Sequence, residues 1–504
     1  MRFLSKSRII AFRQCPKRLW LEVHHPELRE DSAGTQASFL VGHQVGDIAK
    51  RIYDSKGTGS VIDVKNEGYD KAFARSAELL AESSAPIFEA GFRSAGALAF
   101  ADVMLPKGKK GQTAWRMVEV KSSTSVKDYH REDVAVQTFI AQAAGVKLKS
   151  VAVACIDSAW VYPGEENYQG LLTETDLTEE ALSRSAEVKG WIAEAQRVAA
   201  EPVEPEIKMG AHCSVPFDCG FCNYCNRSNP QPEHPLDWLP HFSSAKRDQL
   251  AQQGVIELRE VPDEMLNERQ RLVKQHTLAN SVFFDAAGAA ADLAAHGLPT
   301  FFLDFETIQF AVPIWKGTRP YQQIPFQFSL HAILAPGRLS QQAFLDLSGV
   351  DPSESFANAL VTACGKRGPI FVYNAAFEKS RIAELAKRFP KLARPLSAIT
   401  ARVVDLLPIA RNRYYNPSQQ GSWSIKAVLP AAVPELNYED LTGVKDGAMA
   451  MAAYCEAIQP SVTEERKAEI QKQLLGYCRL DTFAMVRLWQ FFNGRNEPAL
   501  ADVL

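Results

Sequence analysis

Residues 301–307 read FFLDFET, an apolar run that ends in two carboxylates, Asp304 and Glu306, separated by one residue. The run is typical of a buried β-strand, on which residues two apart project from the same face. Two like charges side by side in an apolar setting are costly unless a cation lies between them. Carboxylate oxygens suit Mg²⁺ or Mn²⁺. The stretch therefore predicts a strand that carries a divalent-metal site, with a solvated strand end as the alternative.

The bulk composition indicates a soluble globular protein with more than one domain. The chain has 504 residues, of which 46% are hydrophobic and 23% charged, and this length exceeds what one core supports. The net charge of −3 gives no global basic field, so binding to nucleic acid must come from local patches or bound metal. The N-terminal sequence lacks a signal-peptide pattern, and no run reaches the roughly 20 apolar residues of a membrane span. We expect a cytoplasmic protein without a membrane partner.

Cysteine spacing predicts a metal centre rather than disulfides. Four of the nine cysteines fall within the segment CSVPFDCGFCNYC, and a fifth lies far upstream at position 15. A zinc ribbon needs two C-x₂-C pairs separated by a longer loop, which this spacing lacks, so a [4Fe-4S] cluster is favoured and zinc stays as the alternative. The predicted ligands are Cys15, Cys213, Cys219 and Cys225, with Cys222 as the alternate. The other four cysteines are expected to be core residues: Cys155, Cys364, Cys455 and Cys478.

A second acidic constellation lies between Cys15 and this cysteine-rich segment. Asp102 is part of an alternating, β-rich run, and Glu119 and Lys121 lie two apart in WRMVEVKSS, so they share one strand face. An acid from one strand, with an acid and a lysine from its neighbour, can bind a metal and activate water. The lysine orients the nucleophile or stabilises developing negative charge.

The acids, the E-V-K segment and the flanking cysteines resemble the PD-(D/E)XK nucleases of the RecB type. They are most similar to the iron–sulfur branch that includes CRISPR-associated relatives, over about residues 1–228. The resemblance implies that Asp102 and Glu119 hold the metal and that Lys121 is catalytic. It also implies a metal-binding histidine, a supporting acid and a glutamine on the following helix that contacts substrate; the matching positions are His43, Glu89 and Gln137.

The composition shifts after residue 228. The segment NPQPEHPLDWLP is rich in proline and indicates an extended linker. Residues 243–297 predict two or three helices, most clearly in SSAKRDQLAQQGVIELREVP and DEMLNERQRLVKQHTLA. We interpret residues 229–297 as a linker and helical connector.

The last 207 residues carry further acids in ordered settings. In VYNAAFEKS, Asn374 and Glu378 lie where a strand leads into an amphipathic helix. In KQLLGYCRLDTFAMVRLWQFF, an apolar helix is interrupted by Asp481, and Tyr477 shares its face. A lone acid on the buried stripe of a helix requires a partner. A metal shared with the acids of FFLDFET would supply it.

A basic–aromatic cluster follows Asp405 in ARVVDLLPIARNRYY. Such clusters can hold a single nucleic-acid strand by stacking and phosphate contact, and they can equally be ordinary surface. Its members are Arg411, Arg413, Tyr414 and Tyr415.

The series D-x-E, N-x-x-F-E and Y-x-x-x-D is similar to the three motifs of the DEDD exonucleases. These are ribonuclease-H-like 3′→5′ exonucleases, and the tyrosine indicates their DEDDy subclass. The resemblance covers residues 298–504 and implies two-metal phosphodiester hydrolysis. It implies that Asp304, Glu306 and Asp481 hold the metals and that Tyr477 orients the attacking water. The family usually has Asp where this chain has Glu378, so Asp405 is the alternative for that ligand.

The pairing of the two nuclease patterns resembles a group of uncharacterised bacterial fusions of a RecB-like nuclease and a ribonuclease-H-like domain. The segment GSWSIKAVLP at residues 421–430 is similar to one that these proteins carry after the second motif. The candidate substrate contacts in the C-terminal part are Asn374, Arg411, Arg413 and Lys426.

These patterns predict an α/β protein in three parts. Residues 1–228 form a restriction-endonuclease-like domain with an iron–sulfur site, residues 229–297 a connector, and residues 298–504 a ribonuclease-H-like mixed sheet with flanking helices. The expected function is metal-dependent hydrolysis of DNA in repair, recombination or defence. The alternatives are an RNA 3′→5′ exonuclease, and an iron–sulfur-stabilised nucleic-acid-binding protein with one or both sites inactive.

Overall fold

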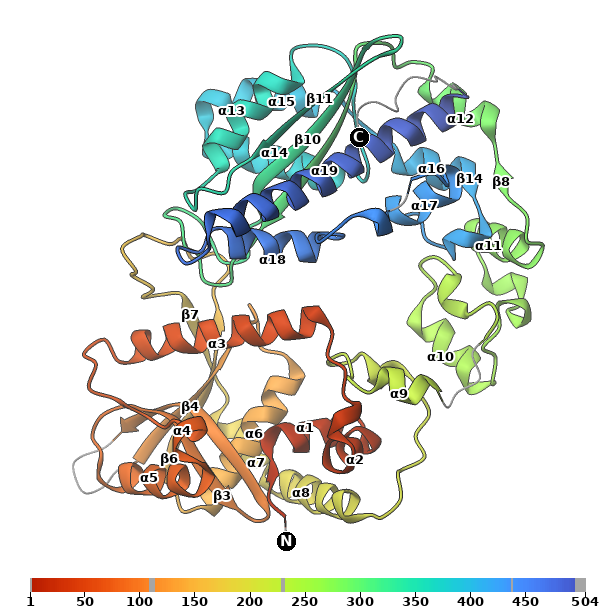
Figure 1. Cartoon of the computed structure of the whole chain (residues 1–504). Coiled ribbons are helices and arrows are strands. Elements are labelled where there is room, and N and C mark those ends of the chain that lie inside the picture. The colour runs from red at the N-terminus through yellow and green to blue at the C-terminus, as the bar shows by residue number, and fades with distance from the viewer. Residues whose placement is uncertain (1, 108–113, 228–231, 437, 495–504) are drawn as a thin grey trace. The chain divides into compact units, whose positions relative to one another are not determined.

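The computed structural model describes residues 2–107, 114–227, 232–436 and 438–494 (Figure 1). The chain divides into two compact units, one formed by residues 1–230 and 310–322 and the other by residues 231–309 and 323–504. The predicted α/β class is confirmed, because each unit combines a mixed sheet with helices. The predicted boundary at residues 228 and 229 lies outside the described residues. No helix in the described parts is long and apolar enough to cross a membrane.

A seven-stranded sheet organises the first unit. Its centre is an antiparallel meander of β3 (Ile87–Ser94), β4 (Ala97–Lys107) and β5 (Ala114–Lys121). Helix α6 (Asp128–Ala143) connects β5 to β6 (Leu148–Ile156), which runs parallel to β5. The remaining strands are β1 (Leu4–Ser5), which pairs with the start of β4, β2 (Ser60–Val61) beside β3, and β7 (Leu172–Asp176) beside β6.

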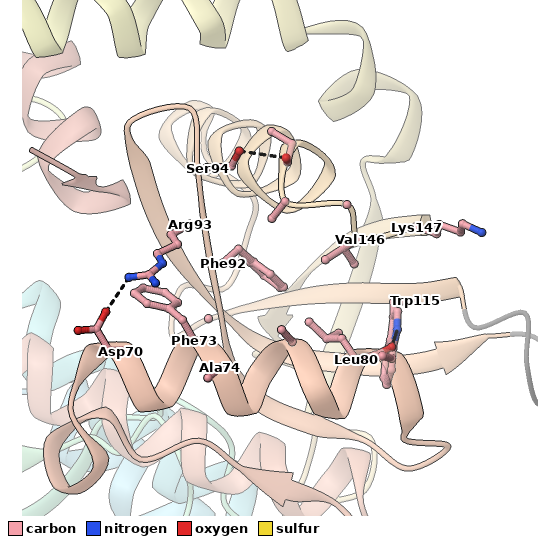
Figure 2. Close-up of a pocket in the computed structure, with 16 residues that line it drawn as sticks. Asp70, Phe73, Ala74, Leu80, Phe92, Arg93, Ser94, Trp115, Val146 and Lys147 are labelled. Atoms are coloured by element: carbon pink, nitrogen blue, oxygen red, sulfur yellow. Dashed lines mark hydrogen bonds and ion pairs between the residues drawn. The ribbon is translucent and has the colours of Figure 1, made fainter. Parts of the chain in front are cut away.

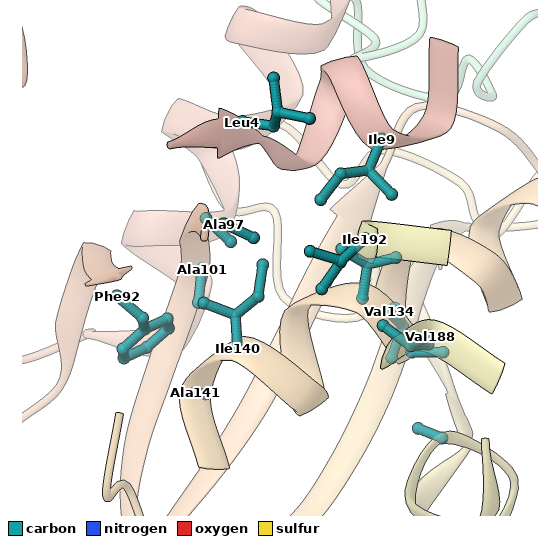
Figure 3. Packing of buried hydrophobic residues seen from close by; sticks show 14 of the residues in the cluster. Leu4, Ile9, Phe92, Ala97, Ala101, Val134, Ile140, Ala141, Val188 and Ile192 are labelled. Carbon is teal, nitrogen blue, oxygen red and sulfur yellow. The ribbon is translucent and has the colours of Figure 1, made fainter. Parts of the chain in front are cut away.

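The main core of this unit lies between the sheet and helices α1 (Lys6–Gln14), α6 and α8 (Ser185–Ala200). Figure 3 shows Ile9 of α1, Val134 of α6 and Ile192 of α8 gathered in one cluster. Buried alanines at alternate positions of β4 face it, and their small side chains let α6 approach the sheet closely.

The other helices of the first unit surround this core. Cys15 separates the first two: its extended backbone ends α1, and Pro16 begins α2, a position where proline is favoured. The remaining bounds are α2 (Pro16–His24), α3 (Ala33–Tyr53), α4 (Val64–Glu67), α5 (Tyr69–Glu82), α7 (Thr178–Ser183) and α9 (Cys222–Arg227), with 3₁₀ turns at Pro26–Leu28 and Ala211–Cys213.

The segment 310–322 belongs to the first unit although its neighbours in sequence belong to the second. Ala311 and Val312 are buried against Val45 and Ile48 of α3. The Tyr321 hydroxyl donates to the Ser122 carbonyl, next to Lys121. The next strand of the second unit begins shortly after this segment, at Ile324.

A five-stranded mixed sheet organises the second unit, in the order β11-β10-β9-β12-β13. The strands β9, β10 and β11 are antiparallel, whereas β12 and β13 run parallel to β9. The bounds are β9 (Thr300–Ile308), β10 (Ile324–Ala335), β11 (Arg338–Leu345), β12 (Ile370–Val372) and β13 (Val403–Asp405), with a separate pair of β8 (Phe283–Phe284) and β14 (Tyr414–Tyr415).

Helices cover both faces of this sheet (Figure 1). Helices α13 (Ser353–Cys364), α14 (Ala376–Arg388) and α15 (Ala393–Thr400) bury one face, which includes Leu303 and Phe305 of β9. The 30-residue α19 (Glu464–Asn493) packs against β9 and β10 from the other face, where Phe302 meets Trp489. The alternation of β9 therefore sends Phe301, Leu303 and Phe305 into the core on one side. It sends Phe302, Asp304 and Glu306 toward α19 on the other.

The remaining helices complete the second unit. The connector forms α10 (Ser244–Gln252) and α11 (Glu268–Leu278), and both lie within the segments predicted to be helical. The Asn267 side chain caps α11 in a capping box with Gln270, which explains where this helix starts. The other bounds are α12 (Ala286–Leu293), α16 (Leu407–Arg413), α17 (Ile425–Ala432) and α18 (Gly447–Ala457), with 3₁₀ turns at Leu236–Trp238, Leu258–Glu260, Asp263–Met265, Pro390–Leu392, Pro417–Gln419 and Tyr438–Asp440.

Candidate active sites

Two carboxylates of β9 begin the site of the second unit. Asp304 lies opposite Ser329 of β10, and Glu306 lies opposite Gln327 after a register shift in β10. Oxygen atoms of both acids and the Cys478 sulfur of α19 lie within 4.8 Å of one another. This triad is a group of described residues whose atoms are close enough to hold a metal ion.

Helix α14 brings a third carboxylate to the acids of β9. The Glu378 side chain is 3% exposed, and its Oε2 atom has no hydrogen-bond partner. Burying a carboxylate oxygen without a hydrogen-bond donor raises the free energy of the folded protein. A cation or a donor from a ligand would therefore stabilise the Glu378 carboxylate. Glu378 lies near enough to Asp304 that its charge helps to raise the pKa of Asp304.

The turn before α14 explains how Glu378 is positioned. Asn374 adopts a left-handed conformation with φ of 72°, which a non-glycine residue seldom adopts. Asp405, at the end of β13, holds this turn: its carboxylate accepts from the backbone N–H groups of Asn374 at 2.9 Å and Ala375 at 3.0 Å, and also from Leu407 at 2.9 Å. Three backbone donors give Asp405 a structural role, and Glu378 rather than Asp405 is the acid that reaches the site.

Helix α19 supplies the fourth carboxylate and the tyrosine. Asp481 and Tyr477 are both buried, one turn apart on the face toward β9. The Tyr438 hydroxyl donates a 2.6 Å hydrogen bond to Asp481 Oδ1. Sequence reasoning missed Tyr438, because the segment PELNYED has no periodic signal that singles it out. It also placed Cys478 in the plain core, whereas its sulfur lies 3.9 Å from Asp304 Oδ2.

The four carboxylates repel one another in this setting. Burial and the charges of Asp481, Glu306 and Glu378 raise the pKa of Asp304 well above its usual value. Burial and Asp481 raise the pKa of Glu306 to about 8. Burial raises the pKa of Glu378 to about 8 and that of Asp481 to about 6. All four can be ionised together at neutral pH only if positive charge enters the site.

Lys426 of α17 is the basic side chain that acts on these acids. Its ammonium group lies 5.2 Å from the centre of the Tyr477 ring and 5.4 Å from that of Tyr438, and it donates to the Lys445 carbonyl at 2.8 Å. Its charge partly offsets the rise in pKa of Glu306 and Asp481. The sequence predicts that Lys426 contacts substrate, and in the structure this side chain lies close enough to Glu306 and Asp481 for its charge to act on them.

Most of the predicted basic–aromatic cluster is occupied in structural contacts. Arg413 forms ion pairs with Asp285 at 2.6 Å and Asp292 at 2.9 Å of the α12 region. Tyr414 and Tyr415 are buried, and their hydroxyl groups bond to the Ala431 carbonyl and to Thr277. These three residues therefore do not offer a surface for a nucleic-acid strand, and the prediction for Arg413 is corrected. Arg411 alone of the cluster lines an open pocket.

The acids of the first unit lie where the paired strands β4 and β5 separate. Pairing between β4 and β5 ends at Val103 and Val118, so Asp102 and Glu119 lie at the point where the two strands separate. Asp102 Oδ2 accepts a 2.7 Å hydrogen bond from the Val120 N–H. On the adjacent β3, Glu89 has a left-handed φ of 58°. Strained backbone inside a strand is a feature that clusters at functional sites.

Two lysines donate hydrogen bonds to the same two carboxylates of this site. Lys121 Nζ donates to Glu119 Oε1 at 2.6 Å and to Asp133 Oδ2 at 2.5 Å. Lys6, the first residue of α1, reaches the same Glu119 oxygen at 2.8 Å and Asp133 at 3.2 Å. Sequence reasoning missed Lys6 and Asp133. The spacing of Asp133 four residues before Gln137 on α6 was the available signal, whereas nothing local distinguishes Lys6.

Gln137 is part of the support of this site. It is fully buried, and its Nε2 donates at 2.7 Å to both Glu119 Oε2 and the Phe100 carbonyl. The prediction that Gln137 contacts substrate is therefore corrected: it fixes the orientation of Glu119. His43 is exposed on α3, near enough that its charge acts on Glu89.

The electrostatics of this site depend on the two lysines. Burial and the Glu119 charge raise the pKa of Asp102 to about 8. Burial acts in the same direction on Glu119, but Lys121 and Lys6 overcome it and hold the pKa of Glu119 well below its usual range. Burial acts to lower the pKa of Lys121, but the charges of Asp133 and Glu119 raise it well above its usual value.

The five predicted cysteine ligands line one small cavity of about 20 Å³ in the first unit. Lys17, Arg18 and Lys208 line the same cavity. The Gln14 side chain donates at 2.7 Å to the carbonyls of His212 and Phe217, which ties the cysteine loop to α1. Among the described residues no three of these sulfurs lie within 4.8 Å of one another. The Cys222 thiol faces the Cys213 carbonyl at 3.7 Å.

A further pocket of about 670 Å³ lies between α5 and β3 (Figure 2). Figure 2 shows Asp70 paired with Arg93 at one end and Trp115 at the other. None of the predicted site residues lines it. A larger pocket of about 820 Å³ in the same unit is lined by Lys6, Lys121 and Asp133, so the larger of the two pockets adjoins the candidate site.

Comparison with known proteins adds one match. Residues 301–424 match a family model described as a domain of unknown function (DUF2779). The matched stretch runs from β9 to the residue before α17, so it contains Asp304, Glu306 and Glu378 but not Asp481. A search of the curated proteins found no match.

Proposed function

We propose that the protein is a divalent-metal-dependent nuclease that hydrolyses DNA at two sites. One is a 3′→5′ exonuclease site of the DEDDy type in the second unit. The other is a RecB-like PD-(D/E)XK site in the first unit. Such a nuclease would act in DNA repair, in recombination or in defence against foreign DNA.

The observation that carries the proposal is the convergence of four carboxylates from three distant segments. Asp304 and Glu306 come from β9, Glu378 from α14 and Asp481 from α19. Burial raises the pKa of each, and repulsion from the other acids of the group raises those of Asp304 and Glu306 further. A fold that gathers four acids in one buried place destabilises itself unless cations compensate, and hard oxygen donors select Mg²⁺ or Mn²⁺.

The fold of the second unit supports the same interpretation. Three antiparallel strands continue into two parallel ones, with helices on both faces. This is the mixed sheet with flanking helices that the ribonuclease-H-like resemblance implies. The first carboxylate pair lies on its central strand, where flanking strands and α19 hold both side chains rigidly.

The residues of the second unit have separate tasks in this reaction. The four carboxylates would hold two metal ions, which stabilise the attacking and leaving oxygens of a phosphodiester. Tyr477, one helical turn before Asp481 on α19, would orient the attacking water. Tyr438 holds Asp481 in place through its 2.6 Å hydrogen bond. The Lys426 ammonium group beside both tyrosines contributes a fixed positive charge near the substrate phosphate.

The first unit supports a site of different composition. Asp102 and Glu119 are the metal ligands, with Glu89 in support. Lys121 bonds to Glu119 and Asp133 and stays protonated, so it orients water and stabilises negative charge on the phosphate rather than accepting a proton. Gln137 fixes the Glu119 carboxylate.

An iron–sulfur cluster is the centre that the cysteine geometry favours. Four sulfurs around one zinc ion, at Zn–S distances of about 2.3 Å, would lie about 3.8 Å apart, and no three sulfurs of the described residues approach within 4.8 Å. Cysteines that bind different iron atoms of a cluster are spaced more widely. The three basic side chains suit the negative charge of a thiolate-ligated cluster. Cys222 is engaged with a backbone carbonyl, so Cys15, Cys213, Cys219 and Cys225 are the preferred ligands.

End-labelled substrates test the function directly. The full-length protein is incubated with single- and double-stranded DNA and RNA, with Mg²⁺, Mn²⁺ or EDTA, and the products are separated by length. We expect metal-dependent shortening of DNA from the 3′ end. The Asp304→Asn/Lys121→Ala double variant should lose cleavage, whereas Glu354→Gln, an exposed acid on α13, should not. Wild-type cleavage by the double variant would refute both site assignments, and cleavage of RNA alone would assign the RNA substrate instead.

A further inference from the structure

A pocket of about 560 Å³ adjoins the carboxylate site of the second unit. The two share the turn between β12 and α14: Tyr373 and Asn374 line the pocket, and Glu378 follows one helical turn later. The other walls are α11, α16 and the loop before α17. The pocket therefore joins the connector to the sheet that carries the acids.

Two arginines from different elements line this pocket. Arg269 comes from α11 and Arg411 from α16, and both line it. Burial and the Arg411 charge lower the pKa of Arg269, which shows that the two guanidinium groups are close. Like charges held together stabilise the protein only when an anion joins them.

The described residues do not supply that anion. Arg411 has no hydrogen bond or ion pair with another described residue, and the partners of Arg269 are the neutral Asn412 side chain at 2.9 Å and the Trp423 ring. The one carboxylate that lines the pocket, Asp237, is paired with Arg247 at 2.6 Å. Charge balance at the two arginines therefore depends on a ligand.

The rest of the lining suits a phosphodiester backbone better than a base. Ser422, Ser424 and Gln420 offer exposed hydroxyl and amide groups. Trp423 is buried, its ring N–H donates to the Tyr414 carbonyl at 2.8 Å, and Arg269 lies over the ring. The Trp423 ring is therefore not open for stacking with a base. Guanidinium groups are the side chains best matched to phosphate.

We propose that this pocket binds the phosphate backbone of a single DNA strand whose 3′ end lies at the carboxylates, with Arg269 and Arg411 as its phosphate contacts. The inference rests on the proposed function and extends it by naming where the strand runs. It assigns a substrate contact to the connector, to which the sequence patterns gave no site residue. Backbone contact without base contact makes the binding independent of base sequence.

The test uses binding without catalysis. Full-length protein is mixed in EDTA with an oligothymidylate that contains photoreactive 4-thiothymidine, irradiated, and the attachment sites are mapped by mass spectrometry. We expect attachment to peptides that line the pocket, including those with Tyr373 or residues 420–425. Arg411→Gln should lower this labelling about tenfold, and Arg269→Gln/Arg411→Gln should lower it further. The exposed Arg338→Gln on β11, far from the lining residues in sequence and unpaired among the described residues, is the matched control.

Salt dependence gives a second measurement. Each phosphate contact on a single strand contributes about 0.7 to the slope of log K against log salt, so the double variant should bind with a slope smaller by about 1.4. Arg411→Gln removes a group without a protein partner and should leave the melting temperature unchanged. Labelling that maps only outside the pocket, or labelling and slope equal to wild type in a folded Arg411→Gln variant, would overturn the proposal.

The two proposals fail separately. Binding in EDTA does not require active carboxylates, so Asp304→Asn should retain pocket labelling. If that variant also keeps wild-type cleavage, the exonuclease assignment fails while the pocket assignment stands. If cleavage is lost in Asp304→Asn but Arg411→Gln labels normally, the pocket assignment fails and the exonuclease assignment stands.

Discussion

In the first unit two lysines reach the acids of the site, whereas in the second unit four carboxylates meet without a salt bridge to any described residue. Lys6 and Lys121 hold the pKa of Glu119 low. In the second unit, burial raises the pKa values of all four acids, and repulsion from neighbouring carboxylates adds to this for Asp304 and Glu306. A site that carries its own cations needs less metal charge than one that does not. The comparison therefore predicts a one-metal type of site in the first unit and a two-metal site in the second.

The largest effect should come from Asp304→Asn. Removing one of two central ligands should lower the exonuclease activity of the second unit at least about a hundredfold. Cleavage by the first unit should continue, since its acids lie on a different sheet. The measurement is the rate of 3′ shortening of end-labelled DNA, with Glu354→Gln as control. An unchanged rate would contradict the role given to β9.

Lys121→Ala probes the other side of the comparison. It removes the cation that bonds to both Glu119 and Asp133, and we expect cleavage by the first unit to fall about a hundredfold when measured in an Asp304→Asn background. Lys6→Ala should cost less, because Lys121 remains on the same oxygen. Equal losses for the two lysines would show that they act as one pair rather than in distinct roles.

The cysteine centre should stabilise the first unit and not the second. Cys213→Ser should abolish iron binding and lower the melting temperature of the first unit by about 4–8 °C, the shift that a loss of about 2 kcal/mol produces in a domain of this size. Iron content and calorimetry measure this. Cys222→Ser and the distant Cys455→Ser should keep the iron. Zinc at one equivalent in the wild-type protein would replace the cluster assignment.

The smallest effect should come from Tyr438→Phe, which removes one hydroxyl and leaves the ring in place. A hydrogen bond to a charged group is worth about 1.5–3 kcal/mol, so we expect exonuclease activity of the second unit to fall about tenfold. Phe at Tyr477 should cost more, because Tyr477 orients water. Rates of end-label shortening for both variants decide this order, and a greater loss for Tyr438→Phe would reverse the two roles.

Much of the site could be predicted from short stretches of sequence, because the residues that share a face lie only two to four positions apart. The D-x-E pair of β9 shares a face through the two-residue period of a strand, and Tyr477 and Asp481 share one through the helical turn. The sequence alone therefore predicts these residues as members of the site. Arg413 was assigned to substrate from its local basic–aromatic cluster and Gln137 from the family resemblance, and the structure contradicts both predictions. Their partners, Asp285 and Glu119, lie 128 and 18 residues away.

The α/β class, the order of the acidic motifs and the cysteine-rich segment follow from the sequence, because periodicity and spacing are properties of short stretches. The charge balance of each site follows only from the tertiary structure. Lys6 comes 113 residues before Glu119, and Arg269 lies on another element than Arg411. Whether an acid meets a lysine, a backbone N–H or another acid depends on which distant strands and helices pack together, and that contact sets its pKa and its role.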